Sequence, residues 1–222
     1  MIVVGTGLVV GVGQYYLNLQ NRPCYRPIAY SLGTFSNQFG ITREEFLAAL
    51  RDAENLWEVK ADRNLFVYEA DGGLKINLIY DERQNSTDAL ELLKERIDHD
   101  RAKLALLPTR PDAQAVGEFN LKVDELNKSI KNYNELVQVV GEKFKEGLYI
   151  SDERGERIIV YQFSNREQLV RLLAHEFGHA LGLEHVADSE AIMYELNDSL
   201  SVKLTGDDIM ALTNLCEADS RE

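Results

Sequence analysis

The sequence predicts an α+β domain with an inserted antiparallel coiled-coil hairpin, and three observations lead to this prediction. Short strand-like segments alternate with amphipathic helical segments on both sides of the middle of the chain, as in layered α+β domains. Between them, residues 83–146 carry apolar residues at alternating spacings of three and four, which is typical of coiled coils. The length of 222 residues and the hydrophobic content of 45% suit one folded domain with a sizeable core.

Residues 1–22 are predicted to form an apolar anchor or a signal-like segment. No charged side chain occurs before Arg22, and about twenty uncharged residues are enough to cross a bilayer. Tyr15 and Tyr16 suit a membrane interface, so residues 2–21 are the candidate for membrane anchoring. Four glycines and the lack of a basic N-terminal region argue against a membrane span or an ordinary signal peptide. The alternative is that this segment forms a buried first strand.

Residues 23–82 are predicted to hold three strands and one helix. The segment PIAYSLGTF, from Pro27, alternates as a strand does, and LFVYEA and LKINLIY are two further strands around turn residues 71–73. Before these two strands, TREEFLAALRDAENLWE begins with Thr42 and Glu45 at capping-box spacing and carries apolar residues along one helical face.

Residues 83–146 are predicted to form the helical hairpin that interrupts the domain. The second half has the strict spacing 4-3-4-3-4-3-4, at Phe119, Val123, Leu126, Ile130, Tyr133, Val137, Val140 and Phe144. The first half follows the same register at Leu90, Leu93, Ile97, Leu104 and Leu107, with Asp100 at one position. Pro108 and Pro111 between the halves indicate a sharp reversal. The alternative, two core helices of an all-α domain, would need wider apolar faces.

Residues 147–222 are predicted to hold two strands followed by two helices. GLYISD and RIIVYQF flank the turn residues ERGE and suit a pair of strands. SNREQLVRLLAHEFGHALG is predicted to be one long helix capped by Ser164 or Asn165, and a final helix is predicted to be capped at Thr205.

Charge and cysteine content narrow the classes of partner and site. The chain has 24 basic and 37 acidic residues and a net charge of −13. Proteins bind nucleic acids and anionic membrane surfaces through basic faces. Because this chain is strongly acidic, we expect no nucleic-acid partner. The two cysteines, Cys24 and Cys216, form no CxxC pair and therefore no zinc knuckle. In an exported protein they would suit a disulfide that ties the two ends together, and two separate buried thiols are the alternative.

Three of the four histidines lie in the stretch HEFGHALGLEH, residues 175–185, and their spacing predicts a zinc site. His175 and His179 are four residues apart and point the same way from a helix, so both imidazoles can bind one ion. Gly182 can end the helix with a positive φ, and the turn can bring His185 back as a third ligand. Three protein ligands leave one tetrahedral position for water, which is the arrangement of a catalytic zinc.

Glu176 adjoins the first of these histidines but is offset by about 100° around the helix, so it is not needed as a ligand. It can accept a proton from a zinc-activated water and later donate it to a leaving amine, which is the chemistry of a zinc endopeptidase. Histidines buried in a core or placed on a solvated face would need neither Gly182 nor the third histidine at its offset. A different class of function stays open, namely a non-proteolytic, zinc-stabilised scaffold that presents the coiled-coil hairpin to a protein partner.

HEFGHALGLEH followed by AIMYEL resembles the metzincin clan of zinc metallopeptidases, and most of all its matrixin branch. The resemblance implies that Met193 is the Met-turn methionine beneath the metal and that Tyr194 begins the segment that walls the S1′ pocket. It extends over residues 25–82 and 147–216 and implies a twisted, mostly parallel sheet with an antiparallel edge strand near RIIVYQF, an active-site helix and a C-terminal helix. It also implies a polypeptide substrate that pairs with the edge strand. The whole chain is similar to bacterial matrixin-like proteases in which a coiled coil interrupts the catalytic domain.

The sequence departs from the matrixin pattern in three places. Glu195 follows Tyr194, where matrixins carry a proline. Residues 83–146 replace the region that holds a structural zinc and calcium in animal matrixins, and because only His99 is left over, one zinc ion is expected. Calcium binding by acidic residues stays open without a supporting motif. Cys24 invites comparison with the cysteine switch of latent matrixins, but it lacks the surrounding sequence of that switch.

The protein is predicted to be extracytoplasmic, either secreted or membrane-anchored, because of the resemblance and the cysteine pair. Disulfides persist mainly outside the cytosol. Arg22 and Arg26 follow the apolar segment, however, and by the positive-inside rule they would favour a cytoplasmic domain.

Overall fold

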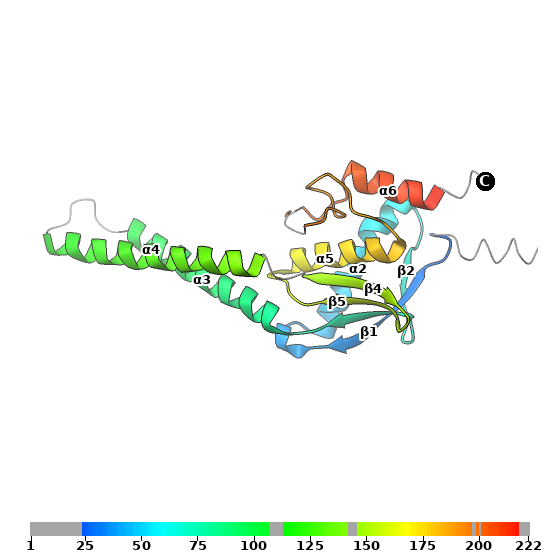
Figure 1. Ribbon diagram of the computed structural model, residues 1–222, viewed down its shortest axis with the longest axis horizontal. Coiled ribbons are helices and arrows are strands. Elements are labelled where there is room, and N and C mark those ends of the chain that lie inside the picture. Colours follow the sequence, from blue (N-terminus) through cyan, green and yellow to red (C-terminus); the bar gives the residue numbers. More distant parts are fainter. Residues whose placement is uncertain (1–23, 107–112, 142–145, 197–198, 200, 218–222) are drawn as a thin grey trace, which may run out of the picture. The chain divides into compact units, whose positions relative to one another are not determined.

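The computed structural model describes residues 24–106, 113–141, 146–196, 199 and 201–217, so the predicted anchor or signal-like segment lies outside the described residues. The chain divides into two compact units (Figure 1). The sheet unit contains the described residues up to Ile79, Gly147–Val160 and those from Asn165 onward, and the hairpin unit contains Tyr80–Glu146 and Tyr161–Ser164.

The sheet unit is built on one five-stranded sheet with the strand order β2-β1-β3-β5-β4. Its strands are β1 (Ile28–Phe35), β2 (Phe66–Tyr68), β3 (Leu74–Leu78), β4 (Gly147–Asp152) and β5 (Gly155–Val160). The pairs within β2-β1-β3-β5 are parallel, and β4 pairs antiparallel with β5. The predicted α+β class and the mostly parallel sheet with an antiparallel edge strand are confirmed. The edge strand is β4, the GLYISD segment, and RIIVYQF lies one strand further in.

Helix α2 (Arg43–Ala61) begins where the sequence predicts, after a short 3-10 helix, η1 (Asn37–Phe39). Thr42 and Glu45 form the reciprocal hydrogen bonds of a capping box, which satisfy backbone N–H groups at the start of the helix. The buried face consists of Phe46, Ala49, Leu50, Ala53 and Trp57. The Trp57 indole N–H also donates to the carbonyl of Ala174 at 2.9 Å, which ties α2 to the helix that carries two of the histidines.

Helix α5 (Arg166–Leu181) lies on the same face of the sheet as α2. Tyr30 of β1 shows this, because its ring contacts Phe177 of α5 while its hydroxyl donates a hydrogen bond to Glu54 of α2. Phe66 of β2 stacks on Phe177, with ring centroids 4.3 Å apart. The N-cap is Asn165, one of the two predicted caps. The inner face of α5 is therefore part of the hydrophobic core of this unit.

Helix α6 (Gly206–Glu217) follows the histidine region and contacts α2. Cys216 in its last turn forms a disulfide with Cys24, which precedes β1, and the two Cα atoms are 5.5 Å apart. The bond joins positions that are 192 residues apart in the sequence, so it links the segment before β1 to the last helix of the sheet unit.

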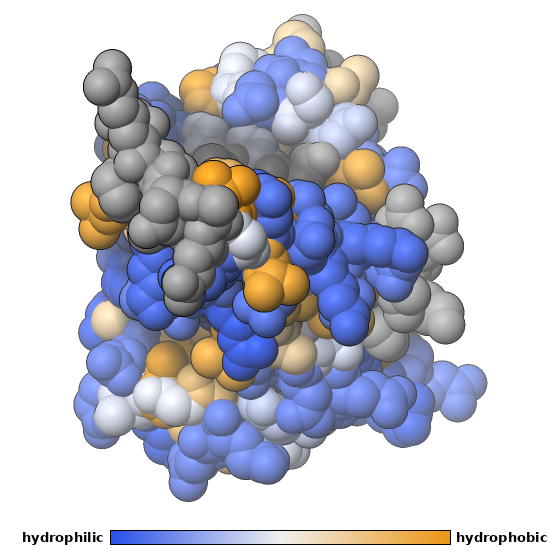
Figure 2. Space-filling model, turned by 90° about the vertical axis from the view of Figure 1, so that its left-hand side faces the viewer, coloured by the Kyte–Doolittle hydropathy of each residue, from blue (hydrophilic) through white to orange (hydrophobic). Residues whose placement is uncertain are grey.

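The hairpin unit contains the helices α3 (Glu82–Ala105) and α4 (Ala113–Gly141), which contact each other and cross in the view of Figure 1. Burial follows the predicted apolar spacing only in part: Ile97 is buried on α3 and Leu126 on α4, whereas the predicted seam residue Val137 is exposed. Phe119 is 40% exposed, and the face shown in Figure 2 is mostly hydrophilic, with hydrophobic residues in separate groups. Two contacting helices are thus present, and the supercoil of a coiled coil stays a prediction. None of the helices among the described residues is long and apolar enough to span a membrane.

Residues 161–164 connect β5 to α5 in the sequence, and they are held by the base of the hairpin. The side-chain amide of Gln84 donates to the carbonyl of Phe163 at 3.1 Å, and its oxygen accepts from the Phe163 N–H at 2.9 Å. Thr87 donates to the side-chain oxygen of Gln162 at 3.0 Å. The first turns of α3 therefore fix the backbone of the segment that leads into α5.

Candidate metal centre

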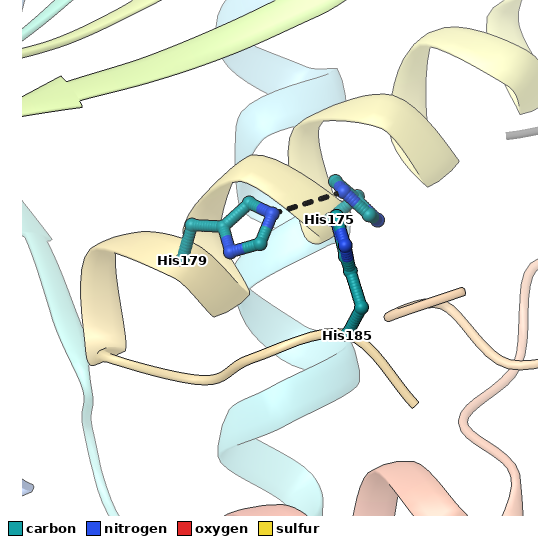
Figure 3. A group of neighbouring side chains, drawn as sticks. All are labelled: His175, His179 and His185. Carbon is teal, nitrogen blue, oxygen red and sulfur yellow. Dashed lines mark hydrogen bonds between the residues drawn. The ribbon is translucent and has the colours of Figure 1, made fainter. Parts of the chain in front are cut away.

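Helix α5 and the turn after it bring the three histidines together. His175 and His179 lie one turn apart on α5, and their Nε2 atoms approach each other (Figure 3). Gly182 ends the helix with φ 100°, and its N–H bonds to the carbonyls of Gly178 and His179. The chain then turns back, and the ring of His185 approaches the other two (Figure 3). The glycine turn expected from the sequence is therefore present.

The ring nitrogens of the three histidines form a compact cluster. One nitrogen from each ring lies within 4.8 Å of the others, and the Nε2 atoms of His175 and His179 are 3.1 Å apart. Zinc–nitrogen bonds of about 2.0–2.1 Å place two tetrahedral ligands about 3.3 Å from each other. Among the described residues, this is the one group of His, Cys, Asp and Glu side chains arranged to hold a metal ion.

Backbone carbonyls determine which nitrogen of each helical histidine faces the cluster. Nδ1 of His175 lies 2.7 Å from the carbonyl oxygen of Ile192, and Nδ1 of His179 lies 2.9 Å from that of Leu183. Because a carbonyl only accepts hydrogen bonds, each Nδ1 carries the proton and each Nε2 keeps a lone pair. Two lone pairs 3.1 Å apart repel each other, and a shared cation would turn this repulsion into coordination. The donor set therefore fits a zinc ion.

Burial keeps His175 in the form that binds metals. Its side chain is 7% exposed, and removal from water lowers its pKa from 6.5 to about 4. A neutral imidazole is the ligand form, because a protonated ring has no lone pair to offer. His179 is half-buried and His185 is exposed, so the cluster is closed on the His175 side and open to solvent on the His185 side.

Glu176 is buried beside the histidine cluster but does not belong to it. The side chain is 4% exposed, and one of its carboxylate oxygens lies near Gly147, the first residue of β4. The carboxylate of the residue that follows the first histidine therefore lies next to the start of the edge strand.

Residues 191–193 form a turn whose backbone is fixed by hydrogen bonds. Asp208 of α6 is fully buried, and its two carboxylate oxygens accept hydrogen bonds from the N–H groups of Ile192 and Met193, both at 2.9 Å. The Met193 carbonyl accepts from the Val186 N–H at 2.9 Å, and the Ile192 carbonyl is the partner of the first histidine. The turn is thereby held against both the first histidine and the residue that follows the third.

The side chains of Met193 and Tyr194 lie next to the elements that carry the histidines. Met193 is fully buried, and its sulfur lies directly against Gly178 of α5, where the lack of a side chain permits the close approach. Tyr194 is half-buried and forms a β-bridge with Val186, next to His185. Both residues therefore occupy positions consistent with the expected Met-turn and pocket wall, and their roles stay proposals.

Sequence reasoning missed two buried charged residues, Arg171 and Asp208. Arg171 is 1% exposed and lies one turn before His175, in an otherwise apolar run of α5. Its guanidinium donates to the carbonyls of Ala191 and Ser201. The sequence does contain a sign of the role of Asp208, because Asp208 stands at capping-box spacing after Thr205. In the structure the Thr205 N–H donates to the Asp208 carboxylate at 2.9 Å.

The cysteine pair bears on the comparison with a cysteine switch. The sulfur of Cys24 is bonded to that of Cys216, so this structure leaves neither thiol to occupy a metal position. The structure therefore favours a covalent link between the ends of the sheet unit over a switch.

The sequence profile of the Matrixin family matches residues 25–217, which is most of the 222-residue chain. The chain belongs to the matrixin family. No curated protein matches the sequence of this matrixin in a similarity search. Membership places it among metallopeptidases and implies a zinc ion, for which His175, His179 and His185 have the matching donor set.

Proposed function

We propose that this matrixin is a zinc-dependent endopeptidase that uses Glu176 as general base and general acid. One observation carries the proposal. His175 and His179 present their Nε2 atoms to a common point that His185 also faces, and Glu176 follows the first of them without joining the cluster. Bound there, zinc would supply a Lewis acid that acidifies water and polarises the scissile carbonyl.

Glu176 moves the protons in this proposal. One carboxylate oxygen accepts a proton as water attacks the carbonyl carbon, and the same proton passes to the nitrogen of the leaving amine as the C–N bond breaks. The side chain is 4% exposed, so bulk water has little access to compete for this proton. Because the carboxylate lies outside the ligand cluster, its oxygens are not committed to the metal.

The proposed substrate is a polypeptide in extended conformation that pairs with the outer edge of β4. This strand is last in the sheet order, and no further strand follows it among the described residues. Gly147 at its start lies next to Glu176, so a peptide added to this edge has its backbone near the carboxylate. Tyr194 is proposed to contribute to the S1′ pocket.

We place the protein outside the cytoplasm, secreted or membrane-anchored, with the hairpin as an accessory that binds a protein partner. The disulfide between Cys24 and Cys216 supports an oxidising compartment, since cytosolic thiols are kept reduced.

The decisive experiment compares Glu176→Ala with the wild-type chain. We expect about one zinc per chain in both proteins, and in the variant a loss of about a thousandfold in the cleavage rate of an unfolded protein substrate. Glu184→Ala is the matched control, because Glu184 is an exposed glutamate within the same motif. If the Glu176→Ala variant still cleaved the substrate, the proposed role of Glu176 as general base and general acid would be refuted. A wild-type chain that binds zinc but cleaves nothing would favour the scaffold function.

A further inference from the structure

Helix α6 contacts, at its two ends, the two segments that place the histidines. Asp208 in its first turn accepts hydrogen bonds from the backbone of residues 192–193, and that backbone also supplies the carbonyl partner of His175. In its last turn Leu215 lies beside Gly182, because a Cβ atom added at Gly182 would stand 3.9 Å from a methyl carbon of Leu215. One helix is therefore in contact with the surroundings of both the first and the third histidine.

We call residues 182–185 the glycine turn, because Gly182 gives the chain the reversal that returns His185 to the cluster. The N–H groups of Gly182 and Leu183 bond back to carbonyls of α5 at 3.0 and 2.9 Å. His185 itself is exposed, whereas His175 is buried. The position of His185 therefore depends on the glycine turn more than on side chains packed around its ring.

The last turn of α6 is attached covalently to the rest of the sheet unit. The buried residues of α6 are Asp208 and Leu212, and both precede this last turn. Helix ends fray unless something holds them. Cys216 directly follows Leu215, and its bond to Cys24 supplies this hold.

Cys24 is a firm anchor for the bond. It is 7% exposed and precedes β1, which pairs with β2 on one side and with β3 on the other. The Ile28 N–H at the start of β1 also donates to the Leu65 carbonyl at 2.8 Å. The disulfide thus ties Leu215, and with it the glycine turn, to a strand inside the sheet.

The disulfide can be reached from solvent on the side of Cys216. This residue is half-buried and lines a surface pocket of about 80 Å³. Lys60 and Arg63 contribute two positive charges to the pocket, and Glu217 contributes one negative charge. Positive neighbours favour the thiolate, which is the form of a thiol that exchanges with disulfides. The pocket is therefore a suitable approach for a thiol reagent.

We infer that the disulfide between Cys24 and Cys216 is a redox-controlled positioning bond for the metal centre. In the oxidised chain it holds Leu215 against the glycine turn and keeps His185 in its ligand position. In the reduced chain the last turn of α6 is released, His185 loses its preorganised position, and zinc affinity falls. The inference rests on the zinc site of the proposed function and goes beyond it, because it assigns a control of metal binding.

A dithiol reductant performs the switch in two exchanges that balance. One thiolate of the reductant attacks Sγ of Cys216, the bond between the two sulfurs breaks, and Cys24 leaves as a thiolate that takes up a proton. The second thiolate then attacks the mixed disulfide and releases Cys216, which is protonated in turn. Two electrons and two protons leave the reductant, which ends as a disulfide, and a disulfide oxidant reverses both exchanges. An exported chain would thus gain its full zinc affinity on oxidation outside the cytosol.

The test measures the zinc affinity of the full-length chain by competition with a chelating dye, together with amide hydrogen exchange of the glycine turn. The oxidised wild type is compared with the Cys24→Ser/Cys216→Ser double variant, which has no thiol to bind zinc. The wild type is also measured after reduction by a dithiol and anaerobic removal of the reductant, because free dithiols compete for zinc.

Three further variants separate positioning from general stability. Leu215→Ala keeps the disulfide but removes the side chain that lies beside Gly182. Met210→Ala is its matched control, because Met210 is 58% exposed on the same helix. Phe46→Leu lowers overall stability at a fully buried position near the start of α2.

We expect the double serine variant and the reduced wild type to bind zinc about tenfold more weakly than the oxidised wild type. Exchange of the Gly182 and Leu183 amides should become about tenfold faster, while the amides of β1 stay protected. Leu215→Ala should bind zinc about fivefold more weakly with its disulfide intact, and reduction should add less than about twofold to this loss. Met210→Ala and Phe46→Leu should keep the zinc affinity of the wild type.

Three results would each overturn the inference. Unchanged zinc affinity in the double serine variant would show that the bond does not control the metal centre. An equal loss of zinc affinity in Phe46→Leu would show that general stability is the cause. An undiminished effect of reduction on Leu215→Ala would show that Leu215 does not connect the bond to the glycine turn.

The inference stays testable if the chain without its disulfide fails to fold. In that case Leu215→Ala decides, because its disulfide is intact, and wild-type zinc affinity in this variant would refute the inference. A zinc-loaded wild type that cleaves no peptide would refute the peptidase function alone, because zinc affinity and amide exchange are measured without a substrate.

Discussion

Gly147 and Glu176 lie so close together that a Cβ atom added at position 147 would stand 3.0 Å from Oε1 of Glu176. The same atom would stand 2.8 Å from a methyl group of Leu172, so it has no room unless one of these side chains moves. The start of the edge strand and the proposed general base are therefore spatially coupled.

We expect Gly147→Ala to displace the Glu176 carboxylate and lower kcat by about tenfold to a hundredfold, because misplaced catalytic groups lose rate steeply. Zinc content should not change, since the histidines are not touched. Gly73→Ala is the control, because a Cβ there meets nothing within 4 Å. Steady-state kinetics with a quenched peptide and metal analysis measure both effects, and a variant with wild-type kcat would contradict the coupling.

Asp208→Asn should weaken both the fold and the metal site. The amide can replace only one of the two acceptor oxygens that hold Ile192 and Met193, so a buried N–H loses its partner. We expect a loss of about 2 kcal/mol in the free energy of unfolding and zinc binding about tenfold weaker, since Ile192 also orients His175. Urea unfolding and competition with a chelating dye measure these quantities. The neighbouring Asp207→Asn should leave zinc affinity intact, and equal effects of the two variants would argue against a specific role for Asp208.

Glu54→Gln should stabilise the protein at neutral pH. Burial raises the pKa of the Glu54 carboxyl, while its hydrogen bond from Tyr30 acts in the opposite direction. A raised folded-state pKa means that this group favours folding most when protonated, and that the benefit is lost as pH rises through that pKa. Glutamine keeps an acceptor for Tyr30 without the charge. The urea midpoint of the variant should exceed that of wild type at pH 7, and the difference should shrink toward pH 4. A variant less stable than wild type at pH 7 would show that the charge is favourable.

Replacement of Cys24 and Cys216 by serine should lower the free energy of unfolding by about 2–5 kcal/mol, because the disulfide restricts a long loop of the unfolded chain. Urea unfolding with and without a reductant measures this. The reductant should destabilise the wild type and leave the serine variant unchanged. If the reductant affected both proteins equally, the bond would not be the source of the difference.

The sequence predicted the features that depend on local spacing. His175, His179 and Gly182 act within one helix and its end, so their geometry follows from the helical repeat and from glycine's access to positive φ. The capping box at Thr42 is local in the same sense. The relative positions of residues within one helix or one turn can therefore be predicted from their spacing in the sequence.

The features that were missed depend on contacts between distant parts of the chain. Arg171 and Asp208 bond to the backbone of residues 191–193, and Arg171 also reaches Ser201. Backbone carbonyls and N–H groups are the same for every residue type, so no sequence pattern marks them as partners. The identity of the edge strand was also non-local, since it depends on β4 folding back beside β5.

The bond between Cys24 and Cys216 makes a closed covalent ring of almost the whole described chain, and the hairpin unit lies within that ring. One cut in the hairpin, whether made by this enzyme or by another protease, would open the ring without separating the pieces. The strands before the cut and the zinc-binding helix after it would stay in one molecule. This molecule would migrate as one band in gel electrophoresis until the disulfide is reduced. Proteolytic nicking of the hairpin would therefore leave the parts of the catalytic unit attached to each other.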